Sequence, residues 1–229
     1  MDSALARRSA VVLGVSTALF AILVAVLLLW DDVDRLDVRF VIWVHRTAPE
    51  NVVDAMQVVT YAGSAIVLGV VALVSAVLLA RRGRGHAAAL LVAAAFGGLA
   101  ATQILKAAIR RARPELDEPY LQLTTYAFPS GHALAATATY GALAMALYMS
   151  LRARRDRRLV LAAFGALILL IAASRVVLGV HYLLDVLAGT IGGVALLSAL
   201  VVVFELAPHR RFRLGVRRDE QTQRPGIDA

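Results

Sequence analysis

The chain has 229 residues, of which 60% are hydrophobic and 17% are charged, and its formal net charge is +8. This composition is too apolar for an ordinary soluble domain and predicts an integral membrane protein. The sequence contains no cysteine, which excludes a thiolate nucleophile, a disulfide framework and sulfur ligands for a metal.

Six apolar runs occur along the chain, and each has roughly the 20 residues that a membrane-crossing helix needs. They cover residues 9–30, 54–80, 87–109, 131–151, 159–178 and 182–206. The predicted fold is therefore all-α, an integral membrane six-helix bundle, and we assign residues 1–206 to a single domain.

The segment of residues 31–46 follows the first apolar run and is too polar to span a membrane. Asp34, Asp37 and Arg39 lie between apolar residues that recur at helical spacing, namely Val33, Leu36, Phe40, Trp43 and Val44. This pattern predicts an amphipathic helix on the outer membrane surface. A plain connecting loop is the alternative.

The basic residues predict the orientation of the chain. With six crossings both termini share one side, and that side holds 16 basic residues against 8 on the other. The positive-inside rule then puts both termini in the cytoplasm, in a multi-pass protein of the cytoplasmic membrane. The charged residues 207–229 have no apolar period, so we expect a disordered basic tail against anionic headgroups. The positive charge reports topology, and no nucleic-acid partner is expected.

Three clusters of polar residues lie at the ends of the predicted spans, where ionisable groups are costly and point to function. The first ends the third span and contains Lys106, Arg113 and Pro114. Lys106 is the only lysine among 24 basic residues, which favours a need for a compact ammonium group. The alternative is a lysine that extends to the headgroups beside a helix-ending Arg-Pro pair.

The second cluster opens the fourth span with Pro129, Ser130, Gly131 and His132. Free backbone NH groups at a helix start favour an anion, glycine allows close approach, and a serine hydroxyl adds a donor. An ordinary serine N-cap is the alternative. A histidine at the start of a membrane helix is uncommon and favours a phosphate cradle.

The third cluster, residues 174–185, joins the fifth and sixth spans. His181 and Asp185 are four residues apart, so on a helix they share a face and the carboxylate can fix the imidazole tautomer. The other imidazole nitrogen then serves as nucleophile or base. A purely structural His-Asp pair is the alternative, which Arg175 in the same segment makes less attractive.

All three clusters fall on the outer side in this topology. Of the five histidines, at positions 45, 86, 132, 181 and 209, His132 and His181 are the two that belong to these clusters. No grouping of His, Asp and Glu has the spacing of a metal site, so we expect neither a metal nor another cofactor.

Together the clusters resemble the type 2 phosphatidic acid phosphatase superfamily, whose signature is Lys-x6-Arg-Pro, Pro-Ser-Gly-His and Ser-Arg-x5-His-x3-Asp. The sequence matches every specified position: Lys106, Arg113, Pro114, Pro129, Ser130, Gly131, His132, Ser174, Arg175, His181 and Asp185. The resemblance implies a membrane lipid-phosphate phosphatase of the undecaprenyl-diphosphatase-like branch.

The resemblance also implies a role for most of the matched residues. His181 would be the nucleophile that forms a phosphohistidine, Asp185 would orient it, and His132 would protonate the leaving oxygen. The phosphoryl oxygens would be held by Lys106, Arg113, Ser130, Gly131 and Arg175. These roles suit phosphoryl transfer, which depends mainly on positioning and on cations matched to the charge of the transition state.

We therefore expect a metal-independent phosphatase that hydrolyses a lipid phosphate of the bilayer at the outer membrane face. Phosphatidic acid, phosphatidylglycerol phosphate and polyprenyl diphosphates stay open as substrates, and the sequence does not set the oligomeric state. A lipid phosphotransferase of the same fold is one alternative. A non-catalytic lipid-binding or transport protein is another, although His132, His181 and Asp185 are all present. Residues 115–126 form either a gate over the site or a solvated loop.

Overall fold

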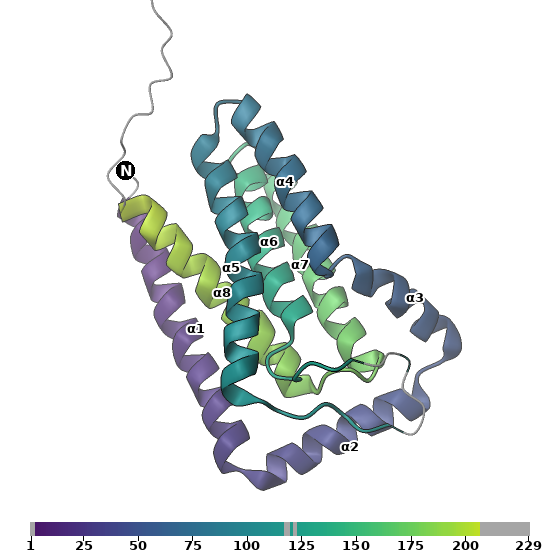
Figure 1. The fold of residues 1–229 in the computed structure, drawn as a ribbon. Coiled ribbons are helices and arrows are strands. Elements are labelled where there is room, and N and C mark those ends of the chain that lie inside the picture. Colours follow the sequence, from purple (N-terminus) through teal and green to yellow (C-terminus); the bar gives the residue numbers. More distant parts are fainter. Residues whose placement is uncertain (1–2, 117–119, 121–122, 207–229) are drawn as a thin grey trace, which may run out of the picture.

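The computed structural model describes residues 3–116, 120 and 123–206. In this part of the chain the regular structure is α-helical throughout, which confirms the predicted all-α class (Figure 1). The helices are α1 (Ser3–Leu29), α2 (Asp31–Thr47), α3 (Glu50–Tyr61), α4 (Ala65–Arg81), α5 (Gly85–Ile109), α6 (Gly131–Tyr148), α7 (Arg154–Val177) and α8 (Leu183–Leu206). The predicted tail, residues 207–229, lies outside the described residues.

Four of the described helices are long and apolar enough to cross a membrane, namely α1, α5, α7 and α8. The pair α3 and α4 passes the same test when it is taken as one span, although it is bent by 47°. The predicted second span, residues 54–80, is therefore not one straight helix. A short break at Ala62, Gly63 and Ser64 divides it.

The predicted count of six membrane spans is not confirmed, because α6 is not apolar enough to qualify. Its 18 residues include His132, two threonines and two tyrosines. Most of them are buried, and α6 packs against α4, α5, α7 and α8. A helix enclosed by protein does not need the apolar surface of a lipid-facing one, so its hydropathy is lower.

The helix predicted over residues 31–46 is present as α2, so the alternative of a plain loop is wrong. It lies across one end of the bundle and connects α1 to α3 (Figure 1). Its inner face buries Val41 against Ala127 and Val176, whereas Leu36 and Trp43 on the other face are 61% exposed. The amphipathic pattern thus follows the contact with the bundle, and its placement on a bilayer stays a prediction.

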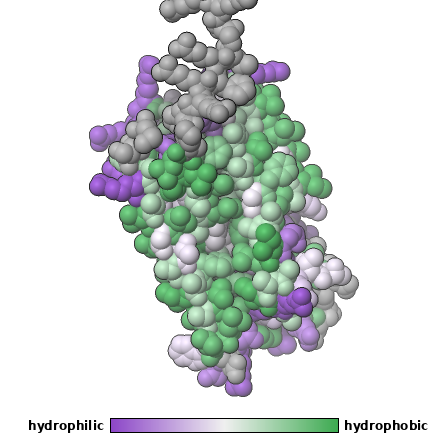
Figure 2. Space-filling model, turned by 60° about the vertical axis from the view of Figure 1, so that its left-hand side comes forward, coloured by the Kyte–Doolittle hydropathy of each residue, from purple (hydrophilic) through white to green (hydrophobic). Residues whose placement is uncertain are grey.

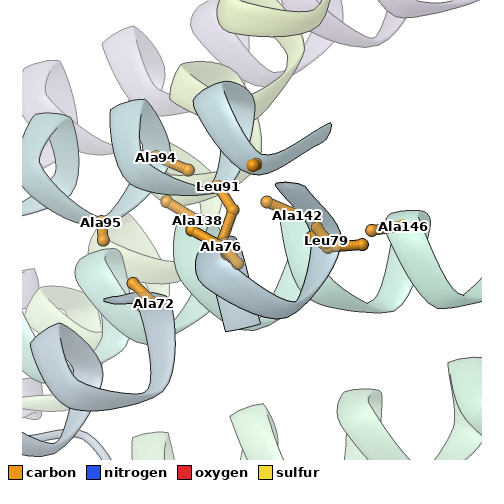
Figure 3. Packing of buried hydrophobic residues seen from close by; sticks show 10 residues of the cluster. Ala72, Ala76, Leu79, Leu91, Ala94, Ala95, Ala138, Ala142 and Ala146 are labelled. Atoms are coloured by element: carbon orange, nitrogen blue, oxygen red, sulfur yellow. The ribbon is translucent and has the colours of Figure 1, made fainter. Parts of the chain in front are cut away.

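The main core lies between α4, α5 and α6 and consists mostly of alanine (Figure 3). Ala72 and Ala76 of α4 face Leu91 and Ala94 of α5, with Ala138 of α6 beside them. Small side chains let helix backbones approach closely, which is the usual basis of helix association where lipid replaces water. This packing holds α5 and α6, which carry two of the predicted clusters.

Apolar residues cover the middle of the surface, and charged residues gather toward its two ends (Figure 2). Leu29, Ile66, Leu73 and Ile104 are each more than three-fifths exposed. Such a belt of exposed apolar side chains is expected of a protein whose surroundings are lipid. With the spanning helices, it identifies a multi-span membrane protein.

The two ends of the described chain lie at the same end of the bundle, where α1 begins and α8 stops (Figure 1). The opposite end holds α2, the segment after α5 and the turn between α7 and α8. That opposite end is where the three predicted clusters meet.

Candidate functional site

The site is built from helix ends that converge beside α2. Lys106 lies in the last turn of α5 and Arg175 in the last turn of α7. Gly131 starts α6, and Asp185 lies in the first turn of α8. His181 lies in the connection between α7 and α8 and is only 2% exposed. The three predicted clusters, far apart in sequence, therefore share one buried region.

Lys106 and Arg113 share their partners on the segment that leads into α6. Lys106 Nζ donates to Thr125 Oγ1 over 3.3 Å and to the Tyr126 carbonyl. Arg113 Nη2 donates to the same Thr125 hydroxyl over 2.9 Å, and its Nε donates to the Thr125 carbonyl over 2.6 Å. Arg113 Nη1 also donates to the Val180 carbonyl, next to His181. These bonds hold two cations next to each other at the site.

Ser130 and Gly131 lie at the start of α6, where α8 packs closely against the backbone. The Ser130 NH donates to the Asp185 carbonyl over 2.9 Å, and Ser130 is fully buried. A Cβ on Gly189 of α8 would stand 2.6 Å from the Ser130 carbonyl, so only glycine permits this contact. Among the described residues the Ser130 hydroxyl has no hydrogen-bond partner. The predicted phosphate cradle therefore contains a buried, unused donor.

Asp185 is fully buried and lies beside His181. The distance from His181 Nδ1 to Asp185 Oδ2 is 3.5 Å, longer than a good hydrogen bond. The same Oδ2 accepts the Tyr182 NH over 2.9 Å, and Oδ1 accepts Arg111 Nη1 over 2.6 Å. The Nδ1 edge of the imidazole is turned toward the carboxylate, but among the described residues Nδ1 has no hydrogen-bond partner. His181 also precedes α8, so the two residues do not share a helix face as predicted.

The charges around His181 favour its neutral form. Burial lowers the pKa of His181 well below the ordinary value of 6.5, and the nearby positive charges of Arg113, Arg175 and Lys106 lower it further. A hydrogen bond with the backbone of Ala127 has the opposite effect and raises the pKa of His181. A buried, neutral imidazole can act as a nucleophile, and the three cations around it favour an anion beside it.

Arg175 is buried beneath α3, with 3% of its surface exposed. Its Nη1 donates to the hydroxyl of Thr60 near the end of α3, and its Nε has no partner among the described residues. The Ser174 hydroxyl, by contrast, donates to the Ile171 carbonyl one turn earlier in α7. Arg175 therefore keeps a donor available at the site, whereas the Ser174 hydroxyl is bonded to the backbone of its own helix.

His132 lies at the start of α6, against the break between α3 and α4. A Cβ placed on Gly63 would stand 3.0 Å from His132 Cδ2 and 2.5 Å from Ile171 Cγ2. The bend that divides the predicted second span is therefore packed directly against a predicted catalytic residue.

Four residues of this region were not predicted as site residues, namely Thr60, Thr125, Arg111 and Asp37. Thr60 and Thr125 bond the predicted cations, and Arg111 and Asp37 contact Asp185 or its helix. The signals available in the sequence were weak. Arg111 lies within the first cluster, and Asp37 lies on the predicted amphipathic helix, but nothing in their spacing indicated a partner.

In the part of the chain that the structure describes, no three His, Asp or Glu side chains group as metal ligands. The positive groups that act on His181 are Arg113, Arg175 and Lys106, and backbone NH groups lie at the start of α6. Cations and helix N-termini of this kind bind phosphate groups.

Known proteins resemble this chain in sequence and in fold. Residues 86–208 match the family model described as the PAP2 superfamily. Phosphatidylglycerophosphatase B of Bacillus subtilis (strain 168) is 35% identical over 88 residues, which cover 38% of this chain and 43% of that protein. The match thus spans less than half the length of the curated relative.

A solved structure shares the fold. It is titled as the crystal structure of the first transmembrane PAP2 type phosphatidylglycerolphosphate phosphatase from Bacillus subtilis, and it matches with a TM-score of 0.77 at 24% identity. The match covers 87% of this chain and 98% of the other. The family model covers more than half of the chain and includes all three clusters, and it confirms the resemblance found in the sequence. The chain belongs to the PAP2 superfamily.

Proposed function

We propose that this protein is a metal-independent lipid-phosphate phosphatase that works through a phosphohistidine on His181. The observation that carries the proposal is the placing of His181, with Nδ1 facing the Asp185 carboxylate and three cations around the ring. Family membership and the curated relative support a lipid phosphatase. The three cations supply the positive charge that phosphoryl transfer requires.

In the first step the Nε2 lone pair of neutral His181 attacks phosphorus and forms an N–P bond. The bond between phosphorus and the lipid oxygen breaks, and the leaving oxygen takes a proton from His132 in its protonated form. Asp185 stabilises the positive charge that develops on the His181 ring. Lys106, Arg113 and Arg175, with the Ser130 hydroxyl and the Gly131 NH, hold the phosphoryl oxygens.

In the second step water attacks the phosphohistidine. Neutral His132 accepts a proton from the water, and the N–P electron pair returns to His181 as inorganic phosphate leaves. His132 is then protonated again and His181 is neutral, so the enzyme returns to its starting state.

The place of the site and the curated relative support the proposed substrate class. The site lies at one end of a bundle of membrane-spanning helices (Figure 1), where phosphates carried on lipids would reach it. Because the curated relative is named a phosphatidylglycerophosphatase, phosphatidylglycerol phosphate is the first substrate to test. Phosphatidic acid and polyprenyl diphosphates are the comparison substrates.

We further propose that both termini lie in the cytoplasm and that the site faces outward, with α2 on the outer surface and α6 as an enclosed sixth span. The distribution of basic residues supports this orientation, since 16 would lie on the side of the termini and 8 on the other side. Because the chain has no cysteine, single cysteines can report it directly. A membrane-impermeant maleimide should label Glu115→Cys in intact cells and Arg82→Cys only after permeabilisation. The reverse pattern would overturn the orientation.

The proposed function is tested by phosphate release from the purified protein in detergent, over the panel of lipid phosphates. We expect activity that EDTA does not abolish and that His181→Ala eliminates. Loss of activity with EDTA would contradict the metal-independent mechanism. A product in which the phosphoryl group has moved to an added alcohol would identify a phosphotransferase instead.

A further inference from the structure

Arg111 connects the start of α8 to α2. Its Nη1 donates to Asp185 Oδ1 over 2.6 Å, and its Nη2 donates to Asp37 Oδ2 over 3.0 Å and to Asp34 Oδ1. Its guanidinium also lies over the ring of Tyr182, 4.0 Å from the ring centroid. A single cation thus joins the carboxylate beside His181 to two carboxylates of another helix.

The network is almost completely buried. The side chains of Arg111, Asp37 and Asp185 are 8%, 3% and 0% exposed, and only Asp34 is half exposed. Burial acts to lower the pKa of Arg111, but the carboxylates of Asp185, Asp34 and Asp37 outweigh it and raise the pKa above its ordinary value. Buried ion pairs contribute little net stability, so a network of this kind is a candidate for a functional role.

Asp37 extends the network to the backbone of α8. Its Oδ1 accepts the NH groups of Leu183 over 2.8 Å and of Leu184 over 3.4 Å, which are the first residues of that helix. A carboxylate at this place satisfies NH groups that have no partner within the helix. The helix α2 therefore contacts the start of α8 twice, through Asp37 directly and through Arg111.

The two oxygens of Asp185 have separate partners. Oδ1 is held by Arg111, whereas Oδ2 accepts the Tyr182 NH and lies 3.5 Å from His181 Nδ1. Any rotation of the carboxylate that brings Oδ2 to or from the imidazole also moves Oδ1 relative to Arg111. The alignment of Asp185 with His181 therefore depends on where Arg111 is held.

We infer that Arg111, anchored on α2 by Asp34 and Asp37, is a positioning residue that fixes the Asp185 carboxylate against His181. The inference rests on the proposed function, since it explains how Asp185 performs its part there. Arg111 acts through Asp185, and the phosphate is bound by the other cations. The competing explanation is that Arg111 only neutralises the buried charges of Asp37 and Asp185.

The two explanations differ in a double variant. Arg111→Met leaves buried carboxylates without a counter-charge, so its melting temperature should fall. Arg111→Met with Asp37→Asn removes one of those charges but keeps an acceptor for the Leu183 NH, so it should regain much of that stability. If Arg111 positions Asp185, the double variant should keep a kcat about 10- to 100-fold below wild type, with KM changed about two-fold or less. Arg111→Lys should restore only part of kcat, because a point charge cannot replace the guanidinium fork.

The matched control is Arg110→Met. Arg110 is exposed, and its Nε donates to the Ala107 carbonyl of its own helix. This variant should keep the kcat of the wild type. A double variant that regains wild-type kcat together with stability would overturn the positioning role, as would a single variant Arg111→Met with full kcat.

A second readout needs no substrate. In protein labelled with 15N-histidine, the His181 signals, assigned with His181→Asn, should report an Nδ1-protonated ring in the wild type and a mixture of tautomers in the double variant. Identical His181 signals in both proteins would overturn the inference. If the wild type releases no phosphate from any lipid, the proposed function fails, and the His181 signals still decide the role of Arg111.

Discussion

His132 packs against Gly63, the residue at the break between α3 and α4, so closely that a Cβ on Gly63 would stand 3.0 Å from His132 Cδ2. Gly63→Ala should therefore displace His132 or push apart α4 and α7, where Ile171 is even closer. We expect kcat for phosphate release to fall about ten-fold or more, with a loss of unfolding free energy of about 1–3 kcal/mol. Steady-state kinetics and thermal unfolding in detergent measure the two effects.

The control for this variant is Gly69→Ala on α4. A Cβ on Gly69 would meet nothing within 4 Å, so the same chemical change there should leave kcat unaltered. Equal kcat in the two variants would show that the packing of Gly63 against His132 does not matter for the reaction.

Thr60→Val keeps the shape of the side chain but removes the hydroxyl that accepts a hydrogen bond from the Arg175 guanidinium. Because Arg175 is buried, the lost bond should cost about 1.5–3 kcal/mol of stability, and the freed guanidinium should bind the phosphate less well. We expect KM to rise several-fold with a smaller change in kcat. Thr190→Val is the matched control, since the Thr190 hydroxyl donates to the Val186 carbonyl of its own helix. A rise in KM for both variants would rule out the specific role of Thr60.

The low pKa of His181 predicts how stability depends on pH. The folded protein keeps His181 neutral, whereas the unfolded chain protonates it below its ordinary pKa of 6.5, so the unfolded state binds more protons there. The unfolding free energy should therefore be lost as the pH falls below that value, by up to about 1.4 kcal/mol per pH unit for this one group. Above it the contribution is fully present.

Thermal unfolding of the wild type and of His181→Asn at several pH values between neutral and mildly acidic measures this effect. The difference between the two proteins removes the contributions of other groups, including Asp37, whose pKa is raised by burial and whose effect has the opposite sign. The wild type should lose stability more steeply on acidification. Parallel curves would contradict a neutral, buried His181.

Much of the fold was predictable because a helix that crosses a lipid bilayer needs a long run of apolar residues. The apolar runs that end at charged residues predicted α5 and α8 to within two residues at each end. The amphipathic period of residues 31–46 predicted α2. In both cases a single local property, hydropathy or its period, determines the element.

Two features of the helices did not follow from hydropathy. The break at Gly63 interrupts a run that reads as one apolar segment, since a glycine within a membrane helix is no signal of a bend. The lower hydropathy of α6 depends on its neighbours, because protein covers most of this helix. Which helices surround α6 is determined by tertiary packing, and the hydropathy of the sequence does not show it.

The polar contacts of the site were even less accessible from the sequence. Arg111 lies 74 positions from both Asp37 and Asp185, and Thr60 lies 115 positions from Arg175. Spacing along the chain carries no information about such pairs. The matched motif positions could be found because each cluster keeps its own local spacing, and their meeting at one end of the bundle follows from the fold.

The central claim is that His181 carries the phosphoryl group, and rapid quenching of the reaction in alkali tests it most directly. The purified protein is mixed with phosphatidylglycerol phosphate, quenched during turnover, digested and analysed by mass spectrometry. We predict one phosphoryl group on the peptide that contains His181, its absence in His181→Asn, and the loss of phosphate release in that variant. Phosphate release by the wild type without a modified His181, together with full activity of His181→Asn, would contradict the account.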